Sequence, residues 1–267
     1  RKILGYVFHV SRFMISDRQK DILEAIIEEY AQGAEPVSSK ALARQRGFNI
    51  GAPMIRKEMN RLELDGFLIS PHTSAGRVPT DKAYRMYIQE NMSHRSNPST
   101  KLGASKTDRV SGLTPKEVEK VASSLKKAWP TEQSLLKEVS RLTSEISKEL
   151  SVAGTVGGAD TYIFGFSNLA EAPEFSSLGN LYQLMHFMDN VDRCFDALWS
   201  KFLYQDLQVL IGSENPIKEI NELALITGRY QLPEGQSGFV SVLGPKRMNY
   251  RRNMALVEYM SEVISSL

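Results

Sequence analysis

Six lysine and arginine side chains are concentrated in one short stretch of the sequence. Between residues 36 and 62 they face a single acid, Glu58, which gives a net charge of +5 over 27 residues: Lys40, Arg44, Arg46, Arg56, Lys57 and Arg61. The whole chain is almost balanced, with 33 basic and 31 acidic residues. A local cationic cluster in a near-neutral chain is typical of a phosphate-binding surface, and it indicates a contact with nucleic acid.

A helix predicted over residues 51–65 has two unlike faces. Ile55, Met59 and Leu62 recur at helical spacing and are expected to pack inward. The opposite side is mainly charged or polar and carries Met54, Lys57, Glu58 and Arg61, with Arg56 and Asn60 on its flank. Side chains that leave such a face can reach base edges in the major groove of DNA.

These outer residues are the predicted base-reading set. We predict that Lys57 and Arg61 read bases and that Met54 makes an apolar contact, with Arg56 and Asn60 beside them. For a helix considered alone, a solvated charged face explains the same residues. A complete helix-turn-helix with a wing around the helix favours the DNA contact.

Further candidate DNA contacts precede and follow this helix. Ser38, Ser39 and Lys40 begin a predicted helix whose free backbone N–H groups can hold a phosphate, although ordinary capping also explains the serines. Arg77 follows a glycine turn and can reach the DNA backbone or the minor groove. His72 can join it, and an exposed histidine that contacts nothing is an equally good interpretation.

The elements that position these residues form a winged helix-turn-helix. Capping residues, apolar spacing and glycine or proline breaks predict helices over 17–33, 38–46, 51–65 and 81–92 and strands over 67–70 and 77–79. We therefore assign residues 14–92 to a DNA-binding domain. Residues 1–13 are expected to be an extension that precedes a natural start at Met14.

The remainder of the chain is predicted to contain a linker and an α+β domain. Residues 93–112 are rich in Ser, Pro, Gly and Lys, which is typical of a linker, and residues 113–151 are predicted to be a helical connector or dimerisation region. Residues 152–267 mix helices and strands without regular alternation. Strands are predicted over 162–166, 207–211, 223–227 and 238–243, helices over 178–203 and 248–267, and a break at 154–158.

Composition argues against several other classes of protein. A content of 42% hydrophobic and 24% charged residues is that of a folded globular chain. The single cysteine, Cys194, cannot form an internal disulfide framework, and the four scattered histidines show no metal-ligand spacing with it. We predict no catalytic residue, no metal and no cofactor. No apolar run approaches the roughly 20 residues of a membrane helix, so a cytoplasmic protein without membrane contact is expected.

Longer motifs at both ends of the chain resemble the heat-inducible transcription repressor HrcA family. In the predicted DNA-binding domain these are DRQK at 17–20, EPVSSK at 35–40, IRKEM at 55–59 and PHTSAGRVPTDKAYR at 71–85. In the C-terminal part they are FSNL at 166–169, PEF at 173–175, IGSEN at 211–215 and GPKRMNY at 244–250. The long motif around the wing is the most specific of these.

The resemblance implies a dimeric repressor with an N-terminal winged helix and a C-terminal GAF-like domain. Such a homodimer is expected to bind double-stranded operator DNA, an inverted repeat upstream of chaperone operons. The resemblance also implies that a GroE-type chaperonin keeps the repressor in its binding-competent form. Because the competent fraction alone binds DNA, the apparent affinity scales with that fraction.

Two features depart from the family pattern. Family members are longer by a dimerising domain inserted in the GAF-like part. This insert and some strands are expected to be absent here, which moves the predicted dimer contact to the helices within 116–150. The family usually reads Ser-Pro-Ala-Thr-Ile-Arg-Asn-Glu-Met where this chain has GAPMIRKEM at 51–59. Met54 and Lys57 replace groups that could read bases, which predicts a different operator sequence.

A small-molecule-sensing winged-helix regulator with another operator is the alternative function. GAF-like domains often bind ligands, and such a pocket needs a few convergent polar groups in an apolar cavity. The predicted loss of strands argues against a complete pocket. Catalysis is not expected, because no nucleophile motif or phosphate-binding glycine loop lies where a strand meets a helix.

Overall fold

A computed structural model shows two compact units in the chain. It describes residues 15–45, 48–72, 76–96, 112–129, 131–157, 161–191, 193–195, 198, 206–232 and 235–267. The first unit extends to Met86, and the second begins at Tyr87 and also includes the short segment Ala31–Ala34.

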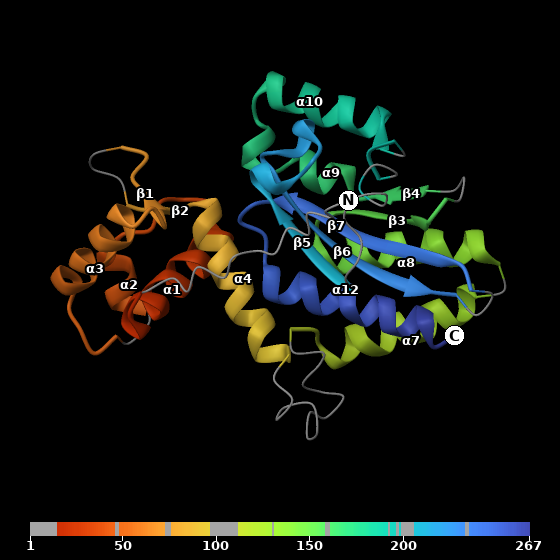
Figure 1. Cartoon of the computed structure of the whole chain (residues 1–267), viewed down its shortest axis with the longest axis horizontal. Coiled ribbons are helices and arrows are strands. Elements are labelled where there is room, and N and C mark those ends of the chain that lie inside the picture. The colour runs from red at the N-terminus through yellow and green to blue at the C-terminus, as the bar shows by residue number, and fades with distance from the viewer. Residues whose placement is uncertain are drawn as a thin grey trace, which may run out of the picture. The chain divides into compact units, whose positions relative to one another are not determined.

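The first unit is a winged helix-turn-helix, as predicted (Figure 1). Its elements are α1 (Asp17–Gly33), α2 (Ser39–Gln45), α3 (Ala52–Leu64), β1 (Leu68–Ile69), β2 (Val78–Pro79) and the beginning of α4 (Asp81–Ser96). The two strands pair antiparallel, with Leu68 opposite Pro79 and Ile69 opposite Val78. The segment between α3 and α4 is therefore a hairpin, which is the wing.

Local sequence signals explain the helix boundaries of this unit. Ser16 and Gln19 form a reciprocal cap, because the Gln19 backbone N–H donates to Ser16 Oγ at 3.3 Å and Gln19 Oε1 accepts from the Ser16 N–H at 2.9 Å. Pro53 lies in the first turn of α3, where its missing N–H costs nothing. The inward side chains of α1, α2 and α3 are fully buried and form one core: Ile22, Leu23, Ile26, Leu42, Ile55 and Leu62.

The second unit is built on a five-stranded antiparallel sheet. Its strands are β3 (Leu150–Thr155), β4 (Thr161–Phe164), β5 (Leu207–Ile211), β6 (Leu223–Gln231) and β7 (Ser237–Pro245), in the order β4-β3-β7-β6-β5. Together with the winged helix, this confirms the predicted α+β class. The break predicted at 154–158 is wrong in its first half, because Gly154 belongs to β3, which lies between β4 and β7.

Helices cover both faces of this sheet (Figure 1). On one face lie α7 (Pro115–Ala128), α8 (Glu132–Ser147) and α12 (Tyr250–Ser265), where α8 contacts β3 and β4 and α12 contacts β6 and β7. The other face carries α9 (Phe166–Ala170) and α10 (Leu178–Asp189), with short 3-10 helices η1 (Pro173–Phe175), η2 (Gly212–Glu214) and η3 (Lys218–Ile220). The helices within 113–151 thus pack as one layer of the C-terminal unit.

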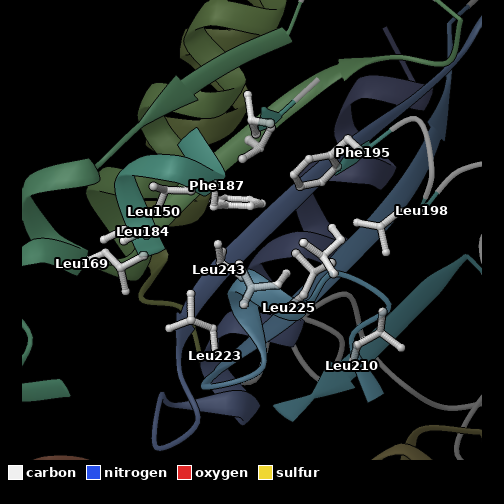
Figure 2. Close-up of a cluster of buried hydrophobic side chains, with 14 of the residues drawn as sticks. Leu150, Leu169, Leu184, Phe187, Phe195, Leu198, Leu210, Leu223, Leu225 and Leu243 are labelled. Carbon is white, nitrogen blue, oxygen red and sulfur yellow. The ribbon is translucent and has the colours of Figure 1, made fainter. Parts of the chain in front are cut away.

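Aromatic and aliphatic side chains fill the layer between the sheet and α10 (Figure 2). Phe187 of α10 and Phe195 point toward Leu225 and Leu243 of the sheet, and Phe195 stacks on Phe239 with ring centroids 5.0 Å apart. All five side chains are buried. This layer gives the unit a core of its own, separate from that of the winged helix.

Candidate nucleic-acid interface

The outer face of α3 carries the side chains that the sequence predicted for it, with one exception. Met54, Arg56, Lys57, Asn60 and Arg61 are exposed, whereas Ile55, Met59 and Leu62 are buried. The five outer side chains are therefore accessible to solvent. An outer face of this composition fits the major groove.

The exception is Glu58, which was expected on the outer face and is 4% exposed. Its carboxylate lies 3.4 Å from Nη1 of Arg61, whose side chain remains 55% exposed. The prediction for Glu58 is wrong because the residue lies three positions after Ile55 and four before Leu62, both of which are buried. Arg61 therefore neutralises the buried acid and still presents donors to solvent.

Backbone hydrogen bonds tie the wing to the segment that precedes α2. Val37 and Arg77 exchange two N–H···O bonds of 2.9 Å, which form an isolated antiparallel bridge beside the hairpin. Gly76 makes this approach possible, because a Cβ there would lie 2.3 Å from the Val37 carbonyl oxygen. The backbone of Arg77 is thereby fixed against the helix-turn-helix.

The guanidinium of Arg77 bridges the wing and α3. Its Nε donates to Glu63 Oε2 at 3.0 Å and its Nη2 donates to Asn60 Oδ1 at 3.1 Å. The third nitrogen, Nη1, donates to Ser70 Oγ at 3.3 Å. The sequence had placed Arg77 and Asn60 separately among the candidate DNA contacts, and the structure brings them together.

The residues predicted at the start of α2 differ in accessibility. Ser38 caps the helix, since its Oγ accepts from the Ala41 N–H at 3.2 Å. Lys40 is exposed, but Ser39 is 5% exposed, so its hydroxyl is withdrawn from the surface. His72 is exposed in the wing, where its backbone oxygen accepts from Ser70 Oγ at 2.7 Å.

Four exposed cations on α2 and α3 make no ion pair with any residue that the structure describes: Lys40, Arg44, Arg56 and Lys57. Arg46, the remaining predicted cation of the cluster, lies outside the described residues. Cations without acidic partners keep their full field toward solvent and are available to phosphates. We define these four residues as the free cation set.

Glu63 and Ser70 are site residues that the sequence did not reveal. Both contact the Arg77 guanidinium, Glu63 with a closest separation of 2.8 Å between its Oε2 and Nη2 of Arg77. Their positions, 14 and 7 residues before Arg77, follow no helical or strand spacing. The charge of Glu63 at the end of α3 was the one available signal, because an acid beside a cationic face needs a partner.

The C-terminal unit contains a buried carboxyl group. Burial raises the pKa of Glu149 to about 8, opposed by Arg247 and reinforced by the charge of Glu174. The Glu149 carboxylate lies against Gly244, where a Cβ would be 2.6 Å from Oε2. Arg247 pairs with Glu174, with 2.7 Å between Nε and Oε1.

Cys194 and His186 show no catalytic arrangement. Cys194 is partly buried against the apolar layer, and burial raises the pKa of its thiol, which disfavours the reactive thiolate. His186 Nδ1 lies 3.9 Å from Glu219 Oε1. Within the described ranges, no group of three His, Cys, Asp or Glu residues could hold a metal ion. Among those residues, no helix combines the length and the apolar character needed to cross a membrane.

Two family models match successive parts of the chain. The model described as winged helix-turn-helix transcription repressor, HrcA DNA-binding, matches residues 14–93, and the model described as HrcA protein C terminal domain matches residues 88–254. Together they cover almost the whole sequence. The first match includes α3, the wing and the free cation set.

Relatives that match the chain over nearly its whole length have one name. The heat-inducible transcription repressor HrcA of Geobacter sulfurreducens is 27% identical, with 95% of this chain and 98% of the relative covered. That of Thermodesulfovibrio yellowstonii is 26% identical, with coverages of 91% and 95%. These alignments extend over 343 and 331 positions, more than the 267 residues of this chain, so the relatives have residues without a counterpart here.

A solved structure shares the fold. The crystal structure of a hypothetical protein at 2.2 Å resolution superposes with a TM-score of 0.71 at 18% identity and covers 94% of this chain and 99% of that one. At this identity the likeness concerns the fold alone.

Proposed function

Because the chain belongs to the HrcA family of heat-inducible transcription repressors, we propose that it represses chaperone operons by binding an inverted-repeat operator as a homodimer. The winged helix makes the DNA contact, and the second unit serves dimerisation and regulation. Family membership supports the assignment as a repressor. The exposed residues on α2, α3 and the wing support the contact with DNA.

The free cation set is the observation that carries the proposal. Lys40, Arg44, Arg56 and Lys57 are exposed without an acidic partner among the described residues. Two of them lie on α3, the helix that such domains insert in the major groove, and two lie on the preceding α2. Phosphate contacts fix the position of the domain, and base contacts fix the sequence. We assign phosphate contacts to Ser38, Lys40 and Arg56, and a further backbone contact to His72.

Base reading is assigned to the remaining outer side chains of α3. Lys57 and Arg61 are long donors suited to guanine, and Met54, which is 40% exposed, provides an apolar contact for a thymine methyl group. Met54 and Lys57 stand where the family has Thr and Asn, so the preferred half-site of this chain differs from that of its relatives.

Dimerisation and control by a GroE-type chaperonin belong to the same proposal and rest on family membership. The apolar residues of α7 and α8, such as Val121, Leu125 and Leu136, are buried inside the C-terminal unit. We therefore do not assign the dimer contact to those two helices. A cytoplasmic location follows from the proposed contact with operator DNA.

The test is fluorescence anisotropy of the full chain on an inverted-repeat duplex of the family type and on a scrambled duplex, at several salt concentrations. A preference of about 10³-fold or more is expected for a specific binder. Equal binding to both duplexes with a steep salt dependence would show that the protein binds DNA but does not prefer the family operator. Adding GroE-type chaperonin is expected to increase the competent fraction without changing the preferred sequence.

The small-molecule sensor has less support from the C-terminal unit. On the sheet face beneath Phe195, the hydroxyls of Thr227 and Ser241 satisfy each other at 2.6 Å. Gln208, paired with Thr227 across the strands, has a buried Oε1 without a partner among the described residues. A rise in melting temperature with one member of a metabolite set would favour the sensor over the chaperonin-coupled repressor.

A further inference from the structure

The Arg77 guanidinium is almost fully engaged within the protein. A guanidinium has five N–H groups. Four donate within the protein: Nε to Glu63 Oε2 at 3.0 Å, Nη2 to Asn60 Oδ1 at 3.1 Å, and Nη1 to Ser70 Oγ at 3.3 Å and to the Gly76 carbonyl at 3.5 Å. Nη2, which carries the fifth N–H, lies 2.8 Å from Glu63 Oε2. The side chain is 19% exposed, so it is held inside the junction between wing and α3.

The guanidinium fixes the orientation of the Asn60 amide. Arginine has donors and no acceptor, so the amide atom that faces Arg77 is the oxygen. Asn60 is exposed, and its Nδ2 contacts none of the described residues. The amide therefore presents two N–H donors on the outer face of α3, while its oxygen is held toward Arg77.

We infer that Asn60 reads a base as a donor alone and that Arg77 is the residue that positions it, an inference that rests on the proposed DNA-binding function. In the major groove guanine offers two adjacent acceptors, N7 and O6, whereas adenine offers one acceptor and one donor. Bidentate recognition of adenine needs the amide oxygen beside Nδ2 in the groove, and the hydrogen bond to Arg77 holds that oxygen toward the wing. Guanine is therefore the base expected opposite Asn60.

The charge of Arg77 leads to a second distinction. Glu63 neutralises Arg77 within the protein, whereas Arg56 has no acidic partner among the described residues. A cation that neutralises a phosphate releases a counterion and steepens the salt dependence of binding. Arg56 is expected to contribute to that slope, and Arg77 is not.

The experiment is selection of bound duplexes from a pool with randomised inverted-repeat half-sites, using the full chain, followed by sequencing. The wild type is expected to enrich guanine at one position of each half-site. Asn60→Ala should lose that preference, by about tenfold in relative affinity. Arg77→Met frees the amide oxygen and should change the enriched base at that position from guanine to adenine.

Arg56→Met is the matched control for the loss of one arginine. It should leave every base preference unchanged and reduce the slope of log affinity against log salt by about 1.8, that is, about 0.9 for each protomer of the dimer. Arg77→Met should leave that slope unchanged. Circular dichroism melts establish that each variant is folded.

Asn60→Asp provides a variant that keeps Arg77. One carboxylate oxygen remains paired with the guanidinium and the other faces DNA as an acceptor, so the preference should change from guanine to cytosine, whose N4 is a donor. This outcome decides the inference if Arg77→Met does not fold.

Three results would overturn the inference while leaving the proposed function intact. These are an unchanged selection with Asn60→Ala, guanine retained with both Arg77→Met and Asn60→Asp, or a salt slope that falls for Arg77→Met as it does for Arg56→Met. If the wild type enriches no sequence at all, the proposed function fails, and the inference fails with it.

Discussion

Four cations of the winged helix and three arginines of the C-terminal unit are used in opposite ways. In the C-terminal unit arginines lie against carboxylates: Arg141 contacts Glu138 and Glu145, Arg247 contacts Glu174, and Arg252 contacts Glu117. On α2 and α3 the free cation set has no such partners among the described residues. Paired charges connect elements of the fold, whereas cations left without acids attract an anionic partner. We therefore expect the paired cations to contribute to stability and the unpaired cations to contribute to DNA binding.

The largest expected effect comes from removing three members of the free cation set together. Lys40→Met, Arg56→Met and Lys57→Met should weaken DNA binding by roughly 10²- to 10³-fold near 0.1 M salt. They should flatten the salt slope by about 3.6, because Lys40 and Arg56 each neutralise a phosphate in both protomers of the dimer. The free energy of unfolding should change by no more than about 0.5 kcal/mol per substitution, because these side chains are exposed.

Anisotropy titrations and urea melts measure the two quantities. Arg141→Met is the matched control, because it removes a paired cation: DNA affinity should be retained. A large loss of stability in the triple variant would contradict the comparison, since it would give the outer cations a role in the fold.

Glu149→Gln should remove a pH dependence of stability. The folded-state pKa of about 8 exceeds the usual value of 4.5, so folding favours the protonated acid. This stabilisation is complete below about pH 4.5 and is lost as the pH rises through 8, with an amplitude of roughly 2–4 kcal/mol. Glutamine stays neutral, so the variant should lose little stability between pH 5 and 8.

Urea melts at several pH values check this prediction. Glu145→Gln is the control, because Lys120 holds the pKa of Glu145 below its usual value. Its contribution is present above the unfolded-state pKa and is lost as the pH falls, outside the window from 5 to 8. Equal pH profiles of wild type and Glu149→Gln would show that the carboxyl group is solvated.

Arg252→Met should have the smallest effect, and on stability alone. Arg252 joins α12 to the beginning of α7 through Glu117 and through the Gly112 carbonyl at 2.9 Å. Losing these partly exposed bonds should cost about 1–2 kcal/mol of unfolding free energy. The exposed Lys116, changed to Met, is the control and should cost almost nothing. A reduced salt slope of DNA binding in Arg252→Met would break the distinction between paired and free cations.

The elements of the winged helix were predictable because their signals are local. A reciprocal cap at Ser16, a proline in the first turn of α3 and apolar residues at helical spacing specify each helix without reference to the others. The same apolar spacing predicts that Glu58 is buried. Glu58 was expected on the outer face because of its charge, although its position in the helix indicates the inner face.

Strand β3 was missed because its composition is weak for a strand. It reads LSVAGT at 150–155, and Gly154 with the following glycines suggested a break. The strand forms because β4 and β7 pair with it on both sides, which is tertiary information. The same holds for the site: Asn60 and Arg77 are 17 residues apart, and only the folded hairpin brings them within 3.1 Å.

The bond between Asn60 and Arg77 also has an entropic consequence. An exposed amide usually rotates freely and loses that freedom when it docks on a base, at a cost of about 0.5–1.5 kcal/mol for an immobilised side chain. Arg77 holds Asn60 before any duplex arrives, so this freedom is already lost on folding. Asn60 is therefore preorganised for binding, and its contribution should appear as favourable binding enthalpy with little opposing entropy.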